Sequence, residues 1–237
     1  MGLVRVEVVS QTDVGRRRES NQDSIFIDEN KKLFIVADGM GGHLGGKEAS
    51  ELAVKAITES FFKKKSDDPL EAIKYAFSKA SHVILEESRR NKKLTGMGTT
   101  GTALYLNQNY AYIGHVGDSR VYLYNKGTLW QLTEDHSLVN EYRKQGLPLT
   151  TKVKADNVLT RSLGATSIVQ TDCLFRKIQA GDVYLMCSDG LTSMLRDGEI
   201  CHVIETTPQK DVAQALIKEA NKKGGEDNIS VILIYIN

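Results

Sequence analysis

The chain has 237 residues, 41% of them hydrophobic, which is enough apolar material for a buried core and excludes wholesale disorder. The formal net charge is only +1, so there is no global electrostatic reason to expect binding to nucleic acid or to an anionic membrane. Because the sequence has no 18-residue apolar run, we expect no membrane span. The three cysteines, Cys173, Cys187 and Cys201, form no C-x-x-C pair, so a disulfide framework is not expected and a reducing, cytoplasmic location is predicted.

The first part of the chain combines short strands with two amphipathic helices. The expected elements are strands over residues 4–9, 24–27 and 33–37, a glycine-rich loop over 39–46, a helix beginning near 49 and a helix over about 70–89. The apolar residues of both helices recur at helical spacing. Two such helices in succession are expected to pack as an antiparallel pair over one face of a sheet.

The rest of the chain is predominantly β. Expected strands lie over residues 99–106, 110–116, 121–124, 128–132, 169–178, 183–188 and 229–236, with helices around 138–145 and over 212–220. Strands that follow one another through short turns indicate hairpins and not βαβ units. Residues 133–165 are polar and irregular, which is typical of a functional loop or flap. The pattern contains no internal repeat and predicts one α+β domain over residues 1–237.

Aspartates recur at the ends of these strands. Three stand beside glycine, at Asp38-Gly39, Gly117-Asp118 and Asp189-Gly190, while Asp23 and Asp227 stand just before strands. An isolated Asp-Gly pair is usually only a turn. Several strand ends that meet at one rim would instead gather carboxylates, which repel one another unless a cation neutralises them; oxygen ligands favour Mg²⁺ or Mn²⁺. The five histidines lack the spacing of a zinc site.

The glycine-rich segment admits a second interpretation. Gly41-x-x-x-x-Gly46-Lys47 follows a strand and opens a helix, as in a nucleotide-binding P-loop, but Glu48 stands where that motif needs Ser or Thr. A tight structural loop around Asp38 is the simpler interpretation.

The run Arg16-Arg17-Arg18 also has two interpretations. It is either a solvated charge run or the source of one guanidinium that binds a phosphoryl group, and the sequence leaves the choice among the three arginines open.

Seven short blocks, taken in order, resemble the PPM-type (protein phosphatase 2C) family of metal-dependent Ser/Thr phosphatases in its compact bacterial form. The blocks are residues 18–23, 38–43, 96–100, 117–120, 160–164, 188–191 and 227–230. Each block alone is weak, but the ordered set is specific and spans essentially the whole chain. The resemblance implies a four-layer αββα sandwich, with two antiparallel sheets flanked by helix pairs and a variable flap at about residues 138–165.

The resemblance also implies roles for individual residues. Asp38 would bridge two Mn²⁺ or Mg²⁺ ions, with the Gly39 carbonyl as a further ligand. Asp189 and Asp227 would hold one of these ions, and Asp118 would join Asp189 at a third, weaker metal site. Asp23 would orient metal-bound water, Arg18 would clamp the phosphate, and Asn228 would support Asp227. Water activated between the two ions would attack phosphorus, so no covalent phosphoenzyme is expected. The implied partners are phosphorylated proteins and a cognate Ser/Thr kinase, and the chain is expected to be a monomer that binds no nucleic acid.

Two positions depart from the family pattern. Gln22 stands where many relatives have Glu, so its neutral amide is expected to contact a metal-bound water. Met40 stands where eukaryotic relatives have His, which leaves the general acid open between His43 and metal-bound water. A non-catalytic module on the same scaffold is disfavoured, because degenerate members usually lose metal-binding aspartates and this chain keeps all five.

Overall fold

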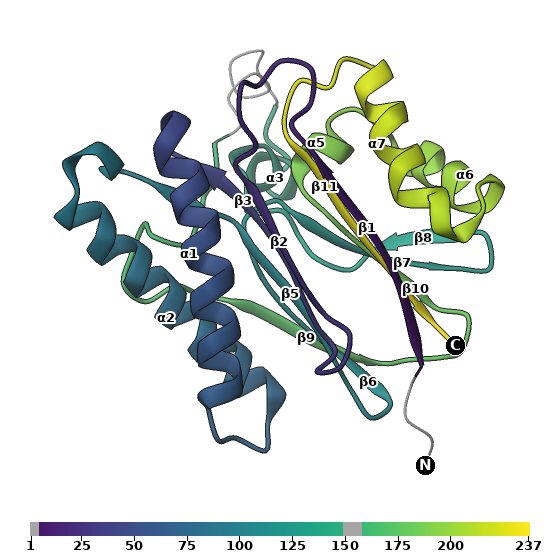
Figure 1. Cartoon of the computed structure of the whole chain (residues 1–237), viewed down its shortest axis with the longest axis horizontal. Coiled ribbons are helices and arrows are strands. Elements are labelled where there is room, and N and C mark those ends of the chain that lie inside the picture. Colours follow the sequence, from purple (N-terminus) through teal and green to yellow (C-terminus); the bar gives the residue numbers. More distant parts are fainter. Residues whose placement is uncertain (1–4, 149–157) are drawn as a thin grey trace.

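The computed structural model describes residues 5–148 and 158–237, without the side chain of His43. Two antiparallel sheets form its centre (Figure 1). The first sheet contains, in spatial order, β1 (Val6–Asp13), β11 (Ile229–Ile236), β10 (Val183–Cys187), β7 (Arg120–Asn125) and β8 (Thr128–Gln131). The second contains β2 (Asp23–Asp28), β3 (Leu33–Met40), β5 (Gly101–Asn107), β6 (Tyr110–Val116) and β9 (Asp172–Lys177), with the short β4 (Gly98–Thr99) paired to β3.

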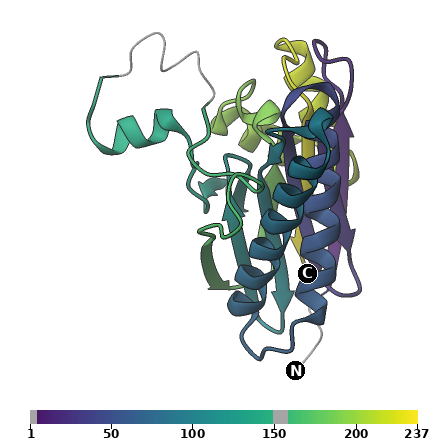
Figure 2. The same cartoon turned by 90° about the vertical axis from the view of Figure 1, so that its left-hand side faces the viewer.

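Helices cover the outer face of each sheet. The second sheet is covered by α1 (Gly42–Lys63) and α2 (Pro69–Arg90), and the first by α6 (Asp197–Thr206) and α7 (Val212–Lys222), as the two views in Figures 1 and 2 show. Shorter helical segments are η1 (Lys92–Leu94), α3 (Leu138–Lys144), α5 (Asp189–Thr192) and η2 (Gln209–Asp211). The expected αββα sandwich is therefore confirmed.

Three apolar clusters hold the layers together. Phe77 and Ile73 of α2 belong to the cluster between the helix pair and the second sheet, while Phe34 and Tyr184 lie in the cluster between the two sheets. Gly114 on β6 permits the close approach of α2, because a Cβ there would lie 2.2 Å from Ile73 Cγ2. Burial of such side chains, each worth about 1.5–3 kcal/mol, is the main force that fixes the sheets and hence the strand ends.

The glycine-rich segment differs from its expected form. Its first residues prolong β3 as far as Met40, and α1 already begins at Gly42, so only Gly41 separates strand from helix. Gly39 and Gly46 approach so closely that a Cβ on Gly39 would lie 1.9 Å from the Gly46 carbonyl oxygen. The P-loop interpretation is wrong, because β3 lies in an antiparallel sheet and Lys47 pairs with Glu51 at 3.9 Å on the exposed side of α1.

Two further elements depart from expectation. β9 is shorter than the strand expected over residues 169–178, and α6 was not expected at all, although Ile200, Val203 and Ile204 stand at helical spacing. The helix expected around residues 138–145 is confirmed as α3, which stands out from the body of the sandwich in Figure 2. Part of the expected flap, residues 149–157, lies outside the described residues. Within the described part of the chain, no helix is long and apolar enough to cross a membrane.

Candidate active site and metal centre

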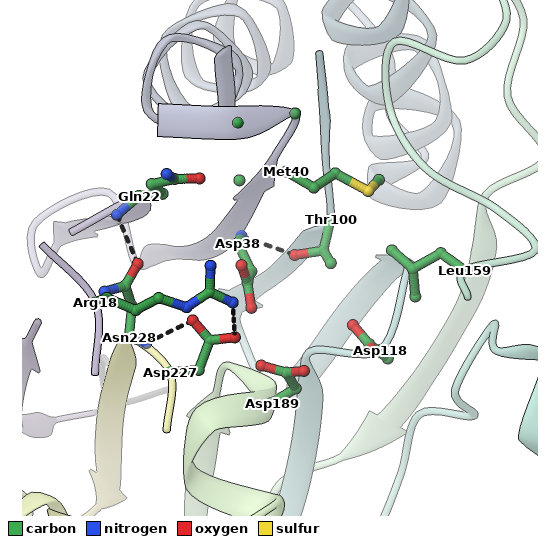
Figure 3. Close-up of a pocket in the computed structure, with 13 residues that line it drawn as sticks. Arg18, Gln22, Asp38, Met40, Thr100, Asp118, Leu159, Asp189, Asp227 and Asn228 are labelled. Carbon is green, nitrogen blue, oxygen red and sulfur yellow. Dashed lines mark hydrogen bonds and ion pairs between the residues drawn. The ribbon is translucent and has the colours of Figure 1, made fainter. Parts of the chain in front are cut away.

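A cavity of about 300 Å³ opens where ends of both sheets meet. It is lined by Arg18, Gln22, Asp38, Gly39, Met40, Gly41, Gly42, Thr100, Asp118, Leu159, Asp189, Asp227 and Asn228. In Figure 3 the carboxylates of Asp38, Asp118, Asp189 and Asp227 point toward the same space. Residues separated by up to 209 positions in the sequence are thus in direct contact, as the ion pair of Arg18 with Asp227 shows.

Each of these four aspartates is placed by the end of a buried strand. Asp38 lies on β3, where its N–H donates to Thr100 Oγ1 at 2.8 Å and its carbonyl accepts from the Thr100 N–H at 2.9 Å. Asp118 lies in the turn between β6 and β7, and Asp189 is the first residue of α5, with one residue between it and the end of β10. Asp227 precedes β11 and accepts a hydrogen bond from the Asn228 N–H at 2.8 Å. The expected gathering of strand-end carboxylates is therefore present.

Asp23 lies behind the cavity and does not line it. It is the cross-strand neighbour of Asp38, and its Oδ2 accepts hydrogen bonds from the hydroxyls of Ser188 and Ser230, both at 2.7 Å. Its Oδ1 is buried and has no hydrogen-bond partner within the part of the chain that the structure describes. Burial raises the pKa of Asp23 to about 7, although the two serine hydroxyls act in the opposite direction.

The cluster is electrostatically strained without a cation. Burial, and then the charges of Asp23 and Asp189, raise the pKa of Asp38 well above its ordinary value. Burial and the charge of Asp189 likewise raise the pKa of Asp118 to about 7, and burial and Asp227 raise that of Asp189. Carboxylates that are both desolvated and close to one another favour the neutral form unless a positive charge compensates them.

Arg18 supplies one positive charge at the rim. Its Nη2 lies 2.6 Å from Asp227 Oδ2, while half of its side chain is exposed. Asn228 fixes the neighbouring chain: its Oδ1 accepts from the Gln22 N–H at 2.8 Å, and its Nδ2 donates to the carbonyls of Val14 and Ser20 at 2.9 and 3.0 Å. The loop that carries Arg18 is therefore tied to the Asp227 end of β11 (Figure 3).

The donor set fits hard divalent cations. Besides Asp23 Oδ1, the buried Oδ1 of Asp189 has no hydrogen-bond partner among the described residues, so two carboxylate oxygens in the cluster have lone pairs that no described protein donor uses. Within residues 5–148 and 158–237, no three acidic, histidine or cysteine side chains already converge at ligand distance on one point. Mg²⁺ retains several water ligands and needs only one or two carboxylates, so such an open acidic cluster suits it.

The comparisons with known proteins decide the family. Residues 12–229 match the family model of protein phosphatase 2C. The chain belongs to the protein phosphatase 2C family. It is 38% identical to the serine/threonine phosphatase stp of Listeria monocytogenes, over 94% of this chain and 93% of the relative. The expected family and enzyme class are thereby confirmed.

Solved structures of family members agree with this membership. The serine/threonine phosphatase of S. agalactiae aligns with a TM-score of 0.89 at 35% identity, covering 98% of this chain and 100% of that one. The catalytic domain of the phosphatase PstP in complex with two manganese ions aligns with a TM-score of 0.88 at 31% identity, covering 99% of both chains. A metal-dependent phosphatase fold is thus shared over nearly the full length.

Some residues of the site were missed by sequence reasoning. Thr100 holds the backbone of Asp38, and Ser188 and Ser230 hold Asp23, yet none of the three was given a role. All three stand inside the short blocks that carry the family resemblance, which was the available signal. The side chain of His43, one of the two candidates for the general acid, lies outside the described part of the structure.

Proposed function

We propose that this member of the protein phosphatase 2C family hydrolyses phosphoserine and phosphothreonine on proteins with the help of two Mn²⁺ or Mg²⁺ ions. The observation that carries the proposal is the cavity in which four aspartates from separate strand ends face one another beside Arg18. The manganese ions of the PstP structure support it. We further propose that the enzyme is a cytoplasmic monomer with one domain, which acts on phosphorylated proteins and opposes a Ser/Thr kinase.

Asp38, the Gly39 carbonyl, Asp189 and Asp227 would hold the two ions, and Asp118 with Asp189 would hold a third, weaker one. When bound, the ions supply activated water and neutralise the charge of the phosphoryl group. Asp23, held by Ser188 and Ser230, would keep a buried acceptor oxygen directed at the same cluster and orient water there. The two unpartnered oxygens of Asp23 and Asp189 support this assignment.

Arg18 would bind the phosphoryl group of the substrate. A guanidinium offers several donors in a planar fork, which matches phosphate oxygens. Hydrolysis adds water across the P–O bond, so the departing serine or threonine oxygen takes up one proton and inorganic phosphate leaves. Two groups could donate that proton, His43 or a water molecule in the site, because the thioether of Met40 carries no acidic proton.

The activity is tested with a phosphothreonine peptide, with Mn²⁺ and after complete removal of metal by a chelator. We expect release of inorganic phosphate with Mn²⁺, loss of release in the chelated sample, and recovery when Mn²⁺ is added back. Hydrolysis at an unchanged rate after metal removal would overturn the proposal. Two further peptides of the same sequence, one with phosphoserine and one with phosphotyrosine at the same position, test the substrate class. We expect phosphate release from the phosphoserine peptide and not from the phosphotyrosine peptide.

Replacing Arg18 with alanine is expected to raise the KM for the phosphothreonine peptide roughly ten-fold and to change kcat less. The physical reason is the loss of a charge-assisted pair with the phosphoryl oxygens; because half of the Arg18 side chain is exposed, we take the low end of the usual range, about 1.5 kcal/mol, which corresponds to roughly ten-fold. Steady-state kinetics on Arg18→Ala, with Arg17→Ala as the matched control from the same exposed run, measure the effect. An unchanged KM for Arg18→Ala beside a raised one for Arg17→Ala would move the phosphate-binding role to Arg17.

A further inference from the structure

His136 joins the turn that carries Asp118 to the segment expected as a flap. Its side chain is almost fully buried, with 2% of its surface exposed. The His136 N–H donates to the Gly117 carbonyl at 2.8 Å, and the Gly117 N–H donates back to His136 Nδ1 at 3.1 Å. These reciprocal bonds involve the residue directly before Asp118, so the side chain of His136 fixes the backbone from which that carboxylate projects.

His136 also lies where the two ends of the expected flap meet. We call these ends, residues 137–138 and 158–160, the flap stems. The His136 carbonyl accepts from the Thr160 N–H at 2.9 Å, and the next residue, Ser137, forms an antiparallel bridge with Leu159. The Leu138 N–H donates to the Val158 carbonyl at 2.9 Å. Leu159 lines the catalytic cavity. His136 therefore stands where the stem that reaches the cavity wall meets the turn of Asp118.

The hydrogen bonds determine which ring nitrogen carries the proton. Because a backbone N–H can only donate, Nδ1 must accept from Gly117, and the proton lies on Nε2. Nε2 then donates to Asp172 Oδ2 at 3.1 Å, and Arg161 holds the other oxygen of that carboxylate at 2.6 Å. Burial lowers the pKa of His136, which keeps the ring neutral and Nδ1 available as an acceptor.

We propose that His136 is a positioning residue: its hydrogen bonds lock the turn that carries Asp118 to the flap stems. The Asp118 carboxylate and the Leu159 side chain, which both line the cavity, are thereby held at a constant position relative to each other. The proposal rests on the proposed phosphatase function only for its kinetic readout. A lost lock would let the turn shift, which would weaken cation binding that involves Asp118 and loosen the cavity wall against a peptide. A residue that served only to fill space would not show either effect.

Two amide substitutions separate the two ends of the ring. In His136→Asn the side-chain oxygen takes the place of Nδ1 and keeps an acceptor for the Gly117 N–H. In His136→Gln the longer amide takes the place of Nε2 and keeps the contact with Asp172, while the acceptor for Gly117 is lost. The pair is matched in polarity and charge, so a difference between them reports on the Gly117 bond.

We expect His136→Gln to bind Mn²⁺ more weakly by isothermal titration and to raise the KM for the phosphothreonine peptide, each by roughly three- to ten-fold, as the loss of one hydrogen bond allows. His136→Asn should restore both values to near those of the native protein. His115→Asn is the control: His115 is equally buried and its ring centroid lies 4.8 Å from that of His136, but it bonds to Thr102 and Glu134 and not to Gly117. It should lower the melting temperature without moving the Mn²⁺ isotherm.

Equal behaviour of the Asn and Gln variants, or a Gln variant closer to the native protein, would overturn the proposal. A measurement on the native protein covers the case in which the variants fail to fold: nitrogen-15 spectra of the imidazole should show the Nε2–H tautomer of His136, and an Nδ1–H tautomer would be incompatible with the lock. If the native protein hydrolyses no phosphopeptide, the proposed function fails, while the Mn²⁺ isotherms and the tautomer still decide the role of His136.

Discussion

Replacing Asp38 with asparagine is expected to abolish phosphopeptide hydrolysis and, at the same time, to raise the melting temperature of the metal-free protein at pH 8. Asp38 is half-buried beside Asp23, Asp189 and further carboxylates, and desolvation together with their charges raises its pKa well above the ordinary value. The ionised form is therefore destabilising without a cation, and an amide of the same shape removes that repulsion. Turnover should fall about 10³-fold or more, because the charge that would hold both ions is lost.

Three measurements on Asp38→Asn check this result. Thermal melts with a chelator at pH 8 give the stability of the metal-free protein, melts with Mn²⁺ give the gain on binding, and phosphate release gives turnover. Asp67→Asn serves as the control, since Asp67 is exposed in the turn between α1 and α2. A variant that melts below the native protein in chelator, or that keeps its turnover, would contradict the placement of Asp38 at the centre of the cluster.

Mn²⁺ is expected to stabilise the native protein much more at pH 8 than at pH 5. The pKa of Asp23 and of Asp118 is raised from 3.8 to about 7 in the metal-free protein. A carboxyl with a raised pKa contributes stability that is fully present below the unfolded value near 4 and is lost as the pH rises through about 7. The cation needs the ionised form, so at pH 5 each such carboxyl that must ionise weakens binding by about two orders of magnitude.

The buried histidines act in the opposite direction and must be separated from this effect. Burial lowers the pKa of His115 to about 4, so its contribution to stability is present above 6.5 and is lost as the pH falls toward 4. That contribution is the same with and without Mn²⁺. The quantity to measure is therefore the difference between the melting temperatures in Mn²⁺ and in chelator, at each pH. An equal difference at pH 5 and pH 8 would contradict the raised pKa of the cluster.

The positions of the aspartates could be predicted because the sequence marks the ends of buried strands with unusual clarity. An apolar run as short as residues 183–187, followed by Asp189-Gly190, favours a buried strand, and Asp189 then lies near its end. The resemblance to a family placed these rims at one site. What the strand pattern could not give was the depth of each carboxylate: Asp23 and Asp38 are cross-strand neighbours, yet only Asp38 lines the cavity.

Other features depend on contacts between distant residues, which local patterns do not encode. The local charge pattern left Arg16, Arg17 and Arg18 open and only the family resemblance pointed to Arg18; the ion pair of Arg18 with Asp227 is a contact of this kind. The early start of α1 at Gly42 arises because Gly39 and Gly46 pack against each other, and the glycines themselves had indicated a loop. The role of His136 is of the same kind, since its two ring nitrogens bond to residues 19 positions before it and 36 after it.

The central position of β11 in its sheet has a consequence for folding during translation. This strand lies between β1 and β10, and the residues just before it supply Asp227 and Asn228. While the ribosome is still making the earlier residues, β1 has no neighbour in its sheet, and Arg18 has no carboxylate opposite it. Phosphate-removing capacity would therefore arise in a single late step of synthesis, and a fragment that stops before residue 227 would be inert toward the phosphoproteins around it.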